Sequence, residues 1–339
     1  MKNIFKISTG LLIIAIAFTS CNNGGSSKSN SALSSNAAEK VYVAPGEHDE
    51  FYAFISGGFS GQLAVYGLPS GRLFKVIPVF SQDAEKAYGY NEETKPMLNT
   101  SFGFIPWDDA HHPDISQTNG VLDGRYVFIN GNNTPRIAKI DLTTFETTEI
   151  IEIPNSAGNH SSSYVTDNTE YVVAGTRFAV PVPQKDMSIN DYKGNFKGTL
   201  SFLKVDPEDG GMDLKFQVLM PGFDYDKAHP GRGKSHGWFF FTTYNTEEAN
   251  SLLEVNASQN DKDFIAAVNW KKIEAYVNNG GGTKMATNYA HNVYSEETHS
   301  ATSTMKKEVL MVDPSEVPGA IYFLPTPKSP HGCDVDPTG

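Results

Sequence analysis

The stretch 136–160, RIAKIDLTTFETTEIIEIPNSAGNH, decides the fold because it recurs as a pattern. It reads as a β-strand, a turn at Asp141, a second strand, a loop and then a histidine. Runs rich in Val, Ile and Thr that are bounded by Gly, Pro, Asn or Asp favour short strands. The stretch 309–332, VLMVDPSEVPGAIYFLPTPKSPHG, follows the same order, with Asp313 at its turn. We therefore expect a repeating unit of short strands that ends in a histidine.

Most of the chain beyond Tyr52 has the same character. Further short apolar runs are FYAFISGG, GQLAVYGL, RLFKVIPVF, RYVFING, YVVAG, TLSFLKVD, LKFQVLM and WFFFTTY. A helix is expected only within 261–280, where FIAAVNW also reads as a strand ahead of a helical KKIEAYVNN. Several short strands per unit, repeated every 40–50 residues or so, are the signature of a β-propeller. We predict an all-β fold in which residues 45–339 form part of a β-propeller.

Histidines recur at the same position of these repeating units. His111 and His112 lie side by side in WDDAHHP, His160 closes the second unit and His331 closes the last. In a propeller, a loop leads from the outer strand of one blade to the innermost strand of the next. We expect all four histidines to occupy such loops and to meet near the propeller axis, where imidazoles from different blades would form a metal site.

The other histidines are interpreted as structural or exposed residues. His236 precedes an apolar strand and is expected at the end of that strand. His291 and His299 lie in polar stretches, YAHN and ETHS, and are expected to face solvent.

The N-terminus carries an export signal. Lys2 and Lys6 precede the apolar run LLIIAIAF, which is too short to span a bilayer comfortably. Residues 1–21 resemble a bacterial lipoprotein signal in which Cys21 becomes lipidated, and residues 22–44 form a Ser/Asn-rich tether. An ordinary cleaved signal peptide with an incidental cysteine remains the alternative. No twin-arginine pair is present, so the general secretion route is expected, with a periplasmic protein that a lipid tethers to the membrane.

Composition and charge narrow the possible partners. Of the 339 residues, 39% are hydrophobic and 19% charged, which is typical of a globular protein. The formal net charge is −12 and no stripe of Lys and Arg stands out, so nucleic acid is not expected as a partner.

Several motifs resemble the N-terminal propeller of nitrous oxide reductase: DDAHHPDIS with LDGRYVFINGNNTPRIAKIDL, then IPNSAGNH, TTYNTEE and PTPKSPHG. The resemblance runs from about residue 45 to the end, and the secretion signal fits the branch of the family without a twin-arginine signal. It implies a seven-bladed propeller whose axis holds a four-copper sulfide cluster bound by seven histidines. It also implies a C-terminal cupredoxin domain with a two-copper site. Such enzymes are homodimers that reduce nitrous oxide to dinitrogen and water, the last step of denitrification, with electrons from a donor such as a cytochrome c or a cupredoxin.

By this resemblance, His111, His112, His160 and His331 match four of the copper ligands. Asp108 and Asp109 are candidates to orient them, because a ligating histidine needs an acceptor for its second ring nitrogen.

The resemblance further implies a calcium site, for which Tyr244, Glu247 and Asp263 match the ligands; oxygen ligands suit this hard cation. The family often has Asn where this chain has Ser329, which puts the fourth side-chain ligand of that site in doubt. Cys333 is the one cysteine left in the mature chain, so no internal disulfide forms, and a packed thiol is favoured over a thiolate ligand.

The chain is expected to be the front part of a longer enzyme, because the sequence stops at a turn that should start a further inner strand. Three cluster ligands and the cupredoxin domain would then lie beyond Gly339. This chain by itself is expected neither to assemble the cluster nor to reduce nitrous oxide.

Two other functions are compatible with a propeller. One is a non-catalytic surface lipoprotein that binds a protein or a glycan. The other is a hydrolase with a single divalent metal at the axis, which would place Asp or Glu at the phase where this chain has histidines.

Overall fold

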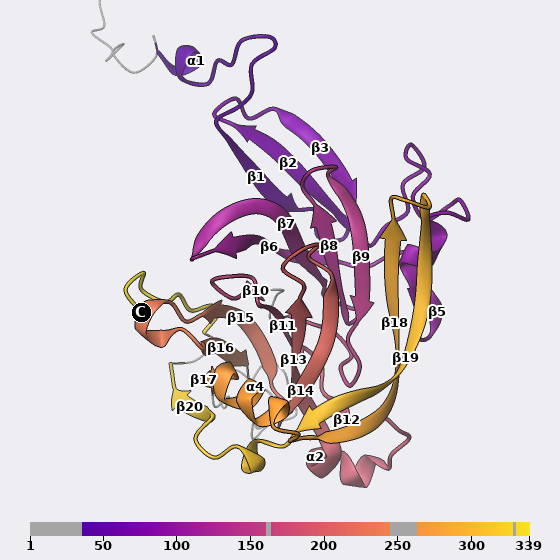
Figure 1. The fold of residues 1–339 in the computed structure, drawn as a ribbon, viewed down its shortest axis with the longest axis vertical. Helices are drawn as coiled ribbons and strands as arrows, with labels where there is room; N and C mark the ends of the chain where they lie inside the picture. The colour runs from indigo at the N-terminus through magenta and orange to yellow at the C-terminus, as the bar shows by residue number, and fades with distance from the viewer. Residues whose placement is uncertain (1–35, 161–163, 245–262, 328–329) are drawn as a thin grey trace, which may run out of the picture.

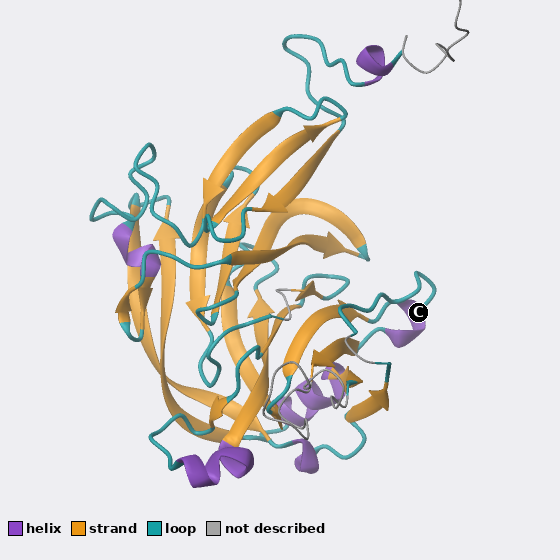
Figure 2. Ribbon diagram, turned by 180° about the vertical axis from the view of Figure 1, so that it is seen from behind, coloured by secondary structure: helices purple, strands orange, loops and turns teal. Residues whose placement is uncertain are grey.

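The computed structural model describes residues 36–160, 164–244, 263–327 and 330–339, and they form an almost entirely β-stranded molecule (Figures 1 and 2). The strands fall into successive antiparallel units along the chain. The first unit is β1 (Phe51–Ser56), β2 (Gln62–Leu68) and β3 (Leu73–Pro78). The second is β6 (Ala110–Thr118), β7 (Val121–Gly131), β8 (Arg136–Asp141) and β9 (Glu146–Glu152).

Two more units follow in the same manner. The third is β10 (Tyr164–Val165), β11 (Tyr171–Gly175), β13 (Phe196–Val205) and β14 (Met212–Pro221), with β12 (Val180–Pro181) paired to β13. The fourth is β15 (Asp224–Pro230), β16 (Trp238–Tyr244), β17 (Phe264–Asn269) and β20 (Ile321–Pro325). The short pair β4 (Asn99–Thr100) and β5 (Gly103–Phe104) lies between the first two units.

Helices are few and short among the described residues. They are α1 (Ala37–Lys40), α2 (Tyr192–Asn195), α4 (Trp270–Asn278) and the 3₁₀ turns η1 (Lys95–Leu98), η2 (Ile189–Asp191), η3 (Gly233–Ser235) and η5 (Pro314–Glu316). In α4 the side chain of Asn269 accepts a hydrogen bond from the backbone N–H of Lys272 and caps the first turn. The expected sequence of a strand followed by a helix within 261–280 is therefore confirmed.

The first strands of the four units lie next to one another. β1 contacts β6, β6 contacts β10, and β10 contacts β15. In Figure 1 these four strands follow one another from the upper part of the molecule downward, and the later strands of each unit extend away from them. This is how the blades of a propeller surround an axis, and it confirms the predicted all-β, β-propeller architecture.

The hydrophobic core lies between successive units rather than in one place. Because side chains alternate along a strand, one face of the third unit packs Phe202 and Phe216 against the fourth unit. Its other face packs Leu203 and Leu214 against the second unit. A separate cluster joins the first unit to the second. The middle units are thus apolar on both faces, which is why their strands read as nearly continuous hydrophobic runs.

A long hairpin departs from the predicted repeat. β18 (Thr283–Ser295) and β19 (Ser300–Val312) pair with each other, and β18 also pairs with β9 while β19 runs parallel to β14. The hairpin thereby joins the second and third units into one eleven-stranded sheet. Residues 309–312 were expected to belong to the same unit as 321–325; this was wrong, because β20 pairs with β17 instead.

The hairpin also corrects the expectation for one histidine. His291 lies within β18, its side chain is only 14% exposed, and its Nε2 is 2.6 Å from Oε1 of Glu149. It is part of the sheet and does not face solvent. His299, in contrast, lies exposed in the turn between the two strands, as expected. His236 lies just ahead of β16, also as expected.

Asp123 on β7 should make the stability of the protein depend on acidity. Burial raises its pKa, but hydrogen bonds from Ser116, Arg125 and Thr118 outweigh this and lower the pKa to about 2. An unfolded aspartate titrates near pH ~3.9. The folded state is therefore stabilised above about pH 4, and this stabilisation is lost as the pH falls toward 2. Asp123→Asn should flatten this part of the curve of unfolding free energy against pH, measured by urea unfolding.

The matched control for this prediction is Asp186→Asn, a change at an exposed loop residue. It should leave the acid dependence unchanged. An Asp123→Asn protein with the same acid dependence as the parent would show that Asp123 does not supply the effect.

Candidate metal centre

Three of the four predicted histidines come together. His111, His112 and His160 each offer one ring nitrogen, and these atoms all lie within 4.8 Å of one another. The ring centroids of His111 and His112 are 4.2 Å apart. The ring centroid of His160 lies 5.4 Å from that of His111 and 5.8 Å from that of His112. His160 lies in the loop between β9 and β10, as expected. His111 and His112 do not lie in a loop: they are the second and third residues of β6.

A register irregularity explains why two adjacent histidines point to one place. Neighbouring side chains on a regular strand point to opposite faces. Here the β6–β7 pairing passes from Ala110↔Gly131 to Pro113↔Ile129, so the two histidines fall in a shift of the ladder. A bulge of this kind bends the strand and redirects side chains. The backbone N–H of His112 donates to Oδ1 of Asn130, 2.8 Å away, which holds the shifted segment to β7.

Carboxylates lie beside the histidine rings. Oδ2 of Asp109 is 3.6 Å from Nδ1 of His111. Asp224, the first residue of β15, places its two oxygens 3.0 and 3.2 Å from Nδ1 of His160. Oδ1 of Asp226 lies 3.4 Å from Nε2 of the same ring. Acceptors of this kind fix the orientation of an imidazole and raise its basicity as a ligand.

His331 reaches this neighbourhood through Asp226. Its Nδ1 is 2.7 Å from Oδ2 of Asp226, so this buried carboxylate lies between His331 and His160. The side chain of His331 is 74% exposed, and it is not one of the three histidines whose nitrogens group together. Its role as a ligand stays a prediction.

The lowered pKa values of His111 and His112 on β6 favour metal binding. Burial, together with the neighbouring His111 and His160, lowers the pKa of His112 to about 3. Burial is also the main cause of the lowered pKa of His111. Burial acts in the same direction on His160, but the hydrogen bond to Asp224 and the charges of Asp224 and Asp226 together outweigh it and leave the pKa raised. At neutral pH the imidazoles of His111 and His112 are therefore uncharged, the state in which an imidazole binds a metal.

Asp108 and Asp109, which precede the His111–His112 pair, point in different directions. Asp109 faces His111 and accepts from Nδ2 of Asn132. Asp108 is fully buried and turns away from the rings: its carboxylate accepts from the backbone N–H groups of Asn133 and Thr134 and lies 3.7 Å from Nη2 of Arg136. Asp108 thus holds the segment in place rather than orienting an imidazole.

The predicted calcium ligands are placed only in part. Tyr244 ends β16, and Asp263 is buried immediately before β17. Because β16 pairs with β17 through Thr243↔Phe264, both residues lie at the same end of this sheet. Glu247, Ser329 and the lipidation candidate Cys21 lie outside the described residues.

Cys333 is a partly buried thiol. Its Sγ donates to the backbone oxygen of Phe240, 3.3 Å away, and burial raises its pKa to about 11. This environment favours the packed thiol over a thiolate ligand.

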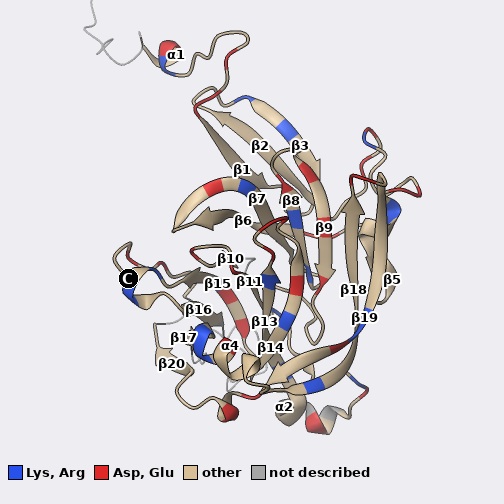
Figure 3. Cartoon of the chain, in the orientation of Figure 1, with Lys and Arg blue, Asp and Glu red and all other residues tan. Residues whose placement is uncertain are grey.

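Sequence reasoning missed Asp224 and Asp226. They flank Tyr225 on β15, and because side chains alternate along a strand, both point to the histidines while Tyr225 enters the core. The red bands on β15 in Figure 3 mark acidic residues there. The available signal was the alternation in FDYDKAHP, on the first strand of the fourth unit.

None of the described helices is long and apolar enough to cross a membrane. In the view of Figure 3, basic residues are scattered among acidic ones, which agrees with the absence of a basic stripe in the sequence.

Fold and site together define a β-propeller protein with a histidine group that could hold a metal ion. Sequence comparison shows that the chain is related to the nitrous-oxide reductases. Its span fits an N-terminal propeller portion of such a protein. It is 30% identical to the nitrous-oxide reductase of Pseudomonas fluorescens over 311 residues, which is 91% of this chain and 44% of that protein. It is 29% identical to that of Stutzerimonas stutzeri over 304 residues, 89% of this chain and 43% of that protein.

The chain therefore spans less than half the length of the curated relatives it matches. No protein-family model matches it. Among solved structures, hydrazine synthase of Kuenenia stuttgartiensis has a TM-score of 0.42 at 11% identity, covering 85% of this chain and 75% of that one. The β-propeller domain of Cps50 (Swd1) has a TM-score of 0.20 at 8% identity, covering 76% and 96%. Both scores are low, and the fold rests on the strand topology described above.

Proposed function

We propose that this chain forms the copper-cluster part of a nitrous oxide reductase, with His111, His112, His160 and His331 as ligands. The observation that carries the proposal is the meeting of histidines from β6 and from the β9–β10 loop within 4.8 Å, in a chain related to these reductases. The bound cluster would be a four-copper sulfide centre on the propeller axis.

The donor set suits copper. Neutral imidazole is a good copper ligand, and His111 and His112 have lowered pKa values. When bound, the cluster supplies the two electrons that, with two protons, convert nitrous oxide to dinitrogen and water. The chain's own contribution is geometry: the β6 bulge aims two rings at one point. Asp109 and Asp224 orient the rings of His111 and His160, and Asp226 orients that of His331.

The wider setting is part of the same proposal. The protein would work in the periplasm as a homodimer, tethered to the membrane if Cys21 is lipidated, and receive electrons from a cytochrome c or a cupredoxin. A calcium ion would bind at the end of β16 and β17, held by Tyr244, Glu247 and Asp263; the buried carboxyl residue Asp263 supports an oxygen-ligand site there.

The test uses the full-length enzyme, of which this chain would be the front part, assembled in its native host. Copper and acid-labile sulfide should co-purify with it, and it should consume nitrous oxide with a reduced dye as donor. His160→Ala should lose both properties, and His299→Ala, a change in an exposed turn, should retain them. A parent protein that carries no copper and consumes no nitrous oxide would refute the proposal.

Asp224→Asn should weaken copper(I) binding about 10–100-fold, because losing the acceptor that orients a ligating imidazole costs about this much in metal affinity. The substitution removes the charged acceptor whose oxygens lie 3.0 and 3.2 Å from Nδ1 of His160. Affinity would be measured by competition with a copper(I) chelator under anaerobic conditions. Asp334→Asn, on an exposed carboxylate, is the control and should bind as the parent does. Unchanged affinity in Asp224→Asn would remove Asp224 from the site.

A further inference from the structure

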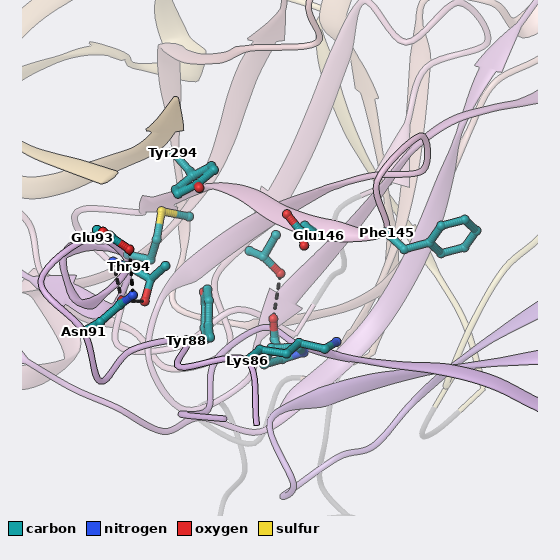
Figure 4. Close-up of a pocket in the computed structure, with 11 residues that line it drawn as sticks. Lys86, Tyr88, Asn91, Glu93, Thr94, Phe145, Glu146 and Tyr294 are labelled. Atoms are coloured by element: carbon teal, nitrogen blue, oxygen red, sulfur yellow. Dashed lines mark hydrogen bonds between the residues drawn. The ribbon is translucent and has the colours of Figure 1, made fainter. Parts of the chain in front are cut away.

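A cavity lies away from the histidines. It has a volume of about 190 Å³ and opens between the 79–98 segment, the start of β9 and the end of β18 (Figure 4). At about 30 Å³ per molecule in the liquid, this is room for roughly six waters. Its lining includes Tyr88, Tyr294, Glu93, Glu146, Met97 and Lys86. None of the lining residues belongs to the candidate metal centre.

Two carboxylates converge on one tyrosine in this cavity. Burial is the main cause of a raised pKa at Tyr294, and Glu146 and Glu93 add to it. The two glutamates come from different elements, the 79–98 segment and β9, and Figure 4 shows them on either side of the space below Tyr294. The charge of Glu296 also raises the pKa of Tyr294. The upper part of the cavity is therefore negatively charged.

Two lysines lie near the cavity, and burial lowers the pKa of one of them, Lys86, while the charge of Glu146 acts to raise it. Nζ of Lys86 donates to the backbone oxygen of Val76 at 2.7 Å. The charge of Lys75 also lowers the pKa of Lys86. Nζ of Lys75 donates to the backbone oxygen of Thr144 at 2.9 Å and lies over the ring of Phe145. Figure 4 shows that ring turned away from the two tyrosines.

Aromatic rings and a thioether form the rest of the wall. The hydroxyl of Tyr88 donates to the backbone oxygen of Val79, 3.0 Å away, so the side chain offers the cavity its ring. Met97, which is fully buried, is also part of the lining. Aromatic faces together with carboxylates attract an ammonium group, because the face of the ring carries the negative end of its quadrupole. A hard metal ion, in contrast, prefers a shell made of oxygen atoms.

The carboxylate of Glu93 is held in position. Nδ2 of Asn91 donates to its Oε2 at 2.9 Å, and its backbone oxygen accepts from the N–H of Ala301 at 2.6 Å. The side chain of Asn91 is itself held by the N–H of Thr94 at 2.9 Å. The cavity is thus preformed, which lowers the entropic cost of binding.

We propose that this cavity is a binding site for a small organic cation that carries an alkylammonium group. The ammonium lies between Glu93 and Glu146 against the ring of Tyr294, and the alkyl part contacts Tyr88 and Met97. The site is independent of the proposed copper chemistry.

Ligand-observed NMR on the full chain at pH 7 tests this, with n-butylammonium as the probe and 1-butanol as its uncharged counterpart. Butylammonium should show saturable binding and 1-butanol should not. The double variant Glu93→Gln/Glu146→Gln should weaken binding at least about fivefold, since it removes both charges facing the ammonium. Glu92→Gln, next to Glu93 but outside the cavity lining, should bind as the parent does.

The aromatic wall is tested separately. Tyr294→Phe should retain the affinity, because the ring remains, and Tyr294→Leu should weaken it about threefold to tenfold. Circular dichroism confirms that each variant is folded. Equal binding of 1-butanol, no saturable binding of butylammonium, or an affinity that the double glutamate variant leaves unchanged would each overturn the proposal.

Discussion

His160→Ala is expected to weaken copper(I) binding by the chain by more than about 100-fold. Removing a group that only orients a ligand costs roughly 10–100-fold, and His160 is one of the three rings whose nitrogens lie within 4.8 Å of one another. The remaining pair on β6 leaves too few donors to hold the ion tightly. Chelator competition under anaerobic conditions measures the affinity.

The matched control for His160→Ala is His299→Ala, which removes an imidazole from an exposed turn. It separates binding at the histidine group from loose binding by surface histidines. If both variants lose the same affinity, copper does not bind at the group, and the proposed function loses its main support.

Arg136→Met is expected to destabilise the fold by about 3–5 kcal/mol, because breaking a buried ion pair from one side leaves the other charge uncompensated. Arg136 and Asp108 both have no exposed surface, and Nη2 of Arg136 is 3.7 Å from Oδ2 of Asp108. The guanidinium also donates to the backbone oxygens of Ile105 and Trp107, each at 3.1 Å. Urea unfolding measures the change.

The comparison variant is Arg72→Met, which removes an exposed partner of Asp49 and should destabilise the fold far less, because exposed ion pairs contribute little. The double variant Arg136→Met/Asp108→Asn should recover part of the loss, since no unpaired carboxylate remains. A cost at Arg136 as small as that at Arg72 would show that the pair does not hold the segment before His111.

The sequence predicts those parts of the fold that are determined by residues close together in the chain. Short Val- and Ile-rich runs between turn residues identify most strands of the four units, and Asn269 marks the boundary between β17 and α4. The recurrence of a histidine after a strand–turn–strand pattern correctly places His160 in the loop after β9. Each of these signals lies within a few residues of the element it predicts.

The parts that escape prediction depend on pairing between distant segments. The convergence of His111 and His112 needs a bulge, which exists only in the register between β6 and β7. His291 reads as exposed because YAHN is polar, yet it is buried against Glu149 of another unit. Asp224 becomes a partner of His160 only once the units are side by side.

The hairpin of β18 and β19 has a consequence for the order in which the chain assembles. Nδ2 of Asn292 donates to the backbone oxygen of Met97, a contact across 195 positions of sequence. Contacts at such separation form slowly, because closing a long loop costs entropy before any contact repays it. Until residue 312 has emerged, β9 and β14 are unpaired edges, and exposed edges invite association with other chains. The sheet that joins the second and third units is therefore completed only when this hairpin docks, and the exposure of the edges of β9 and β14 ends at that point.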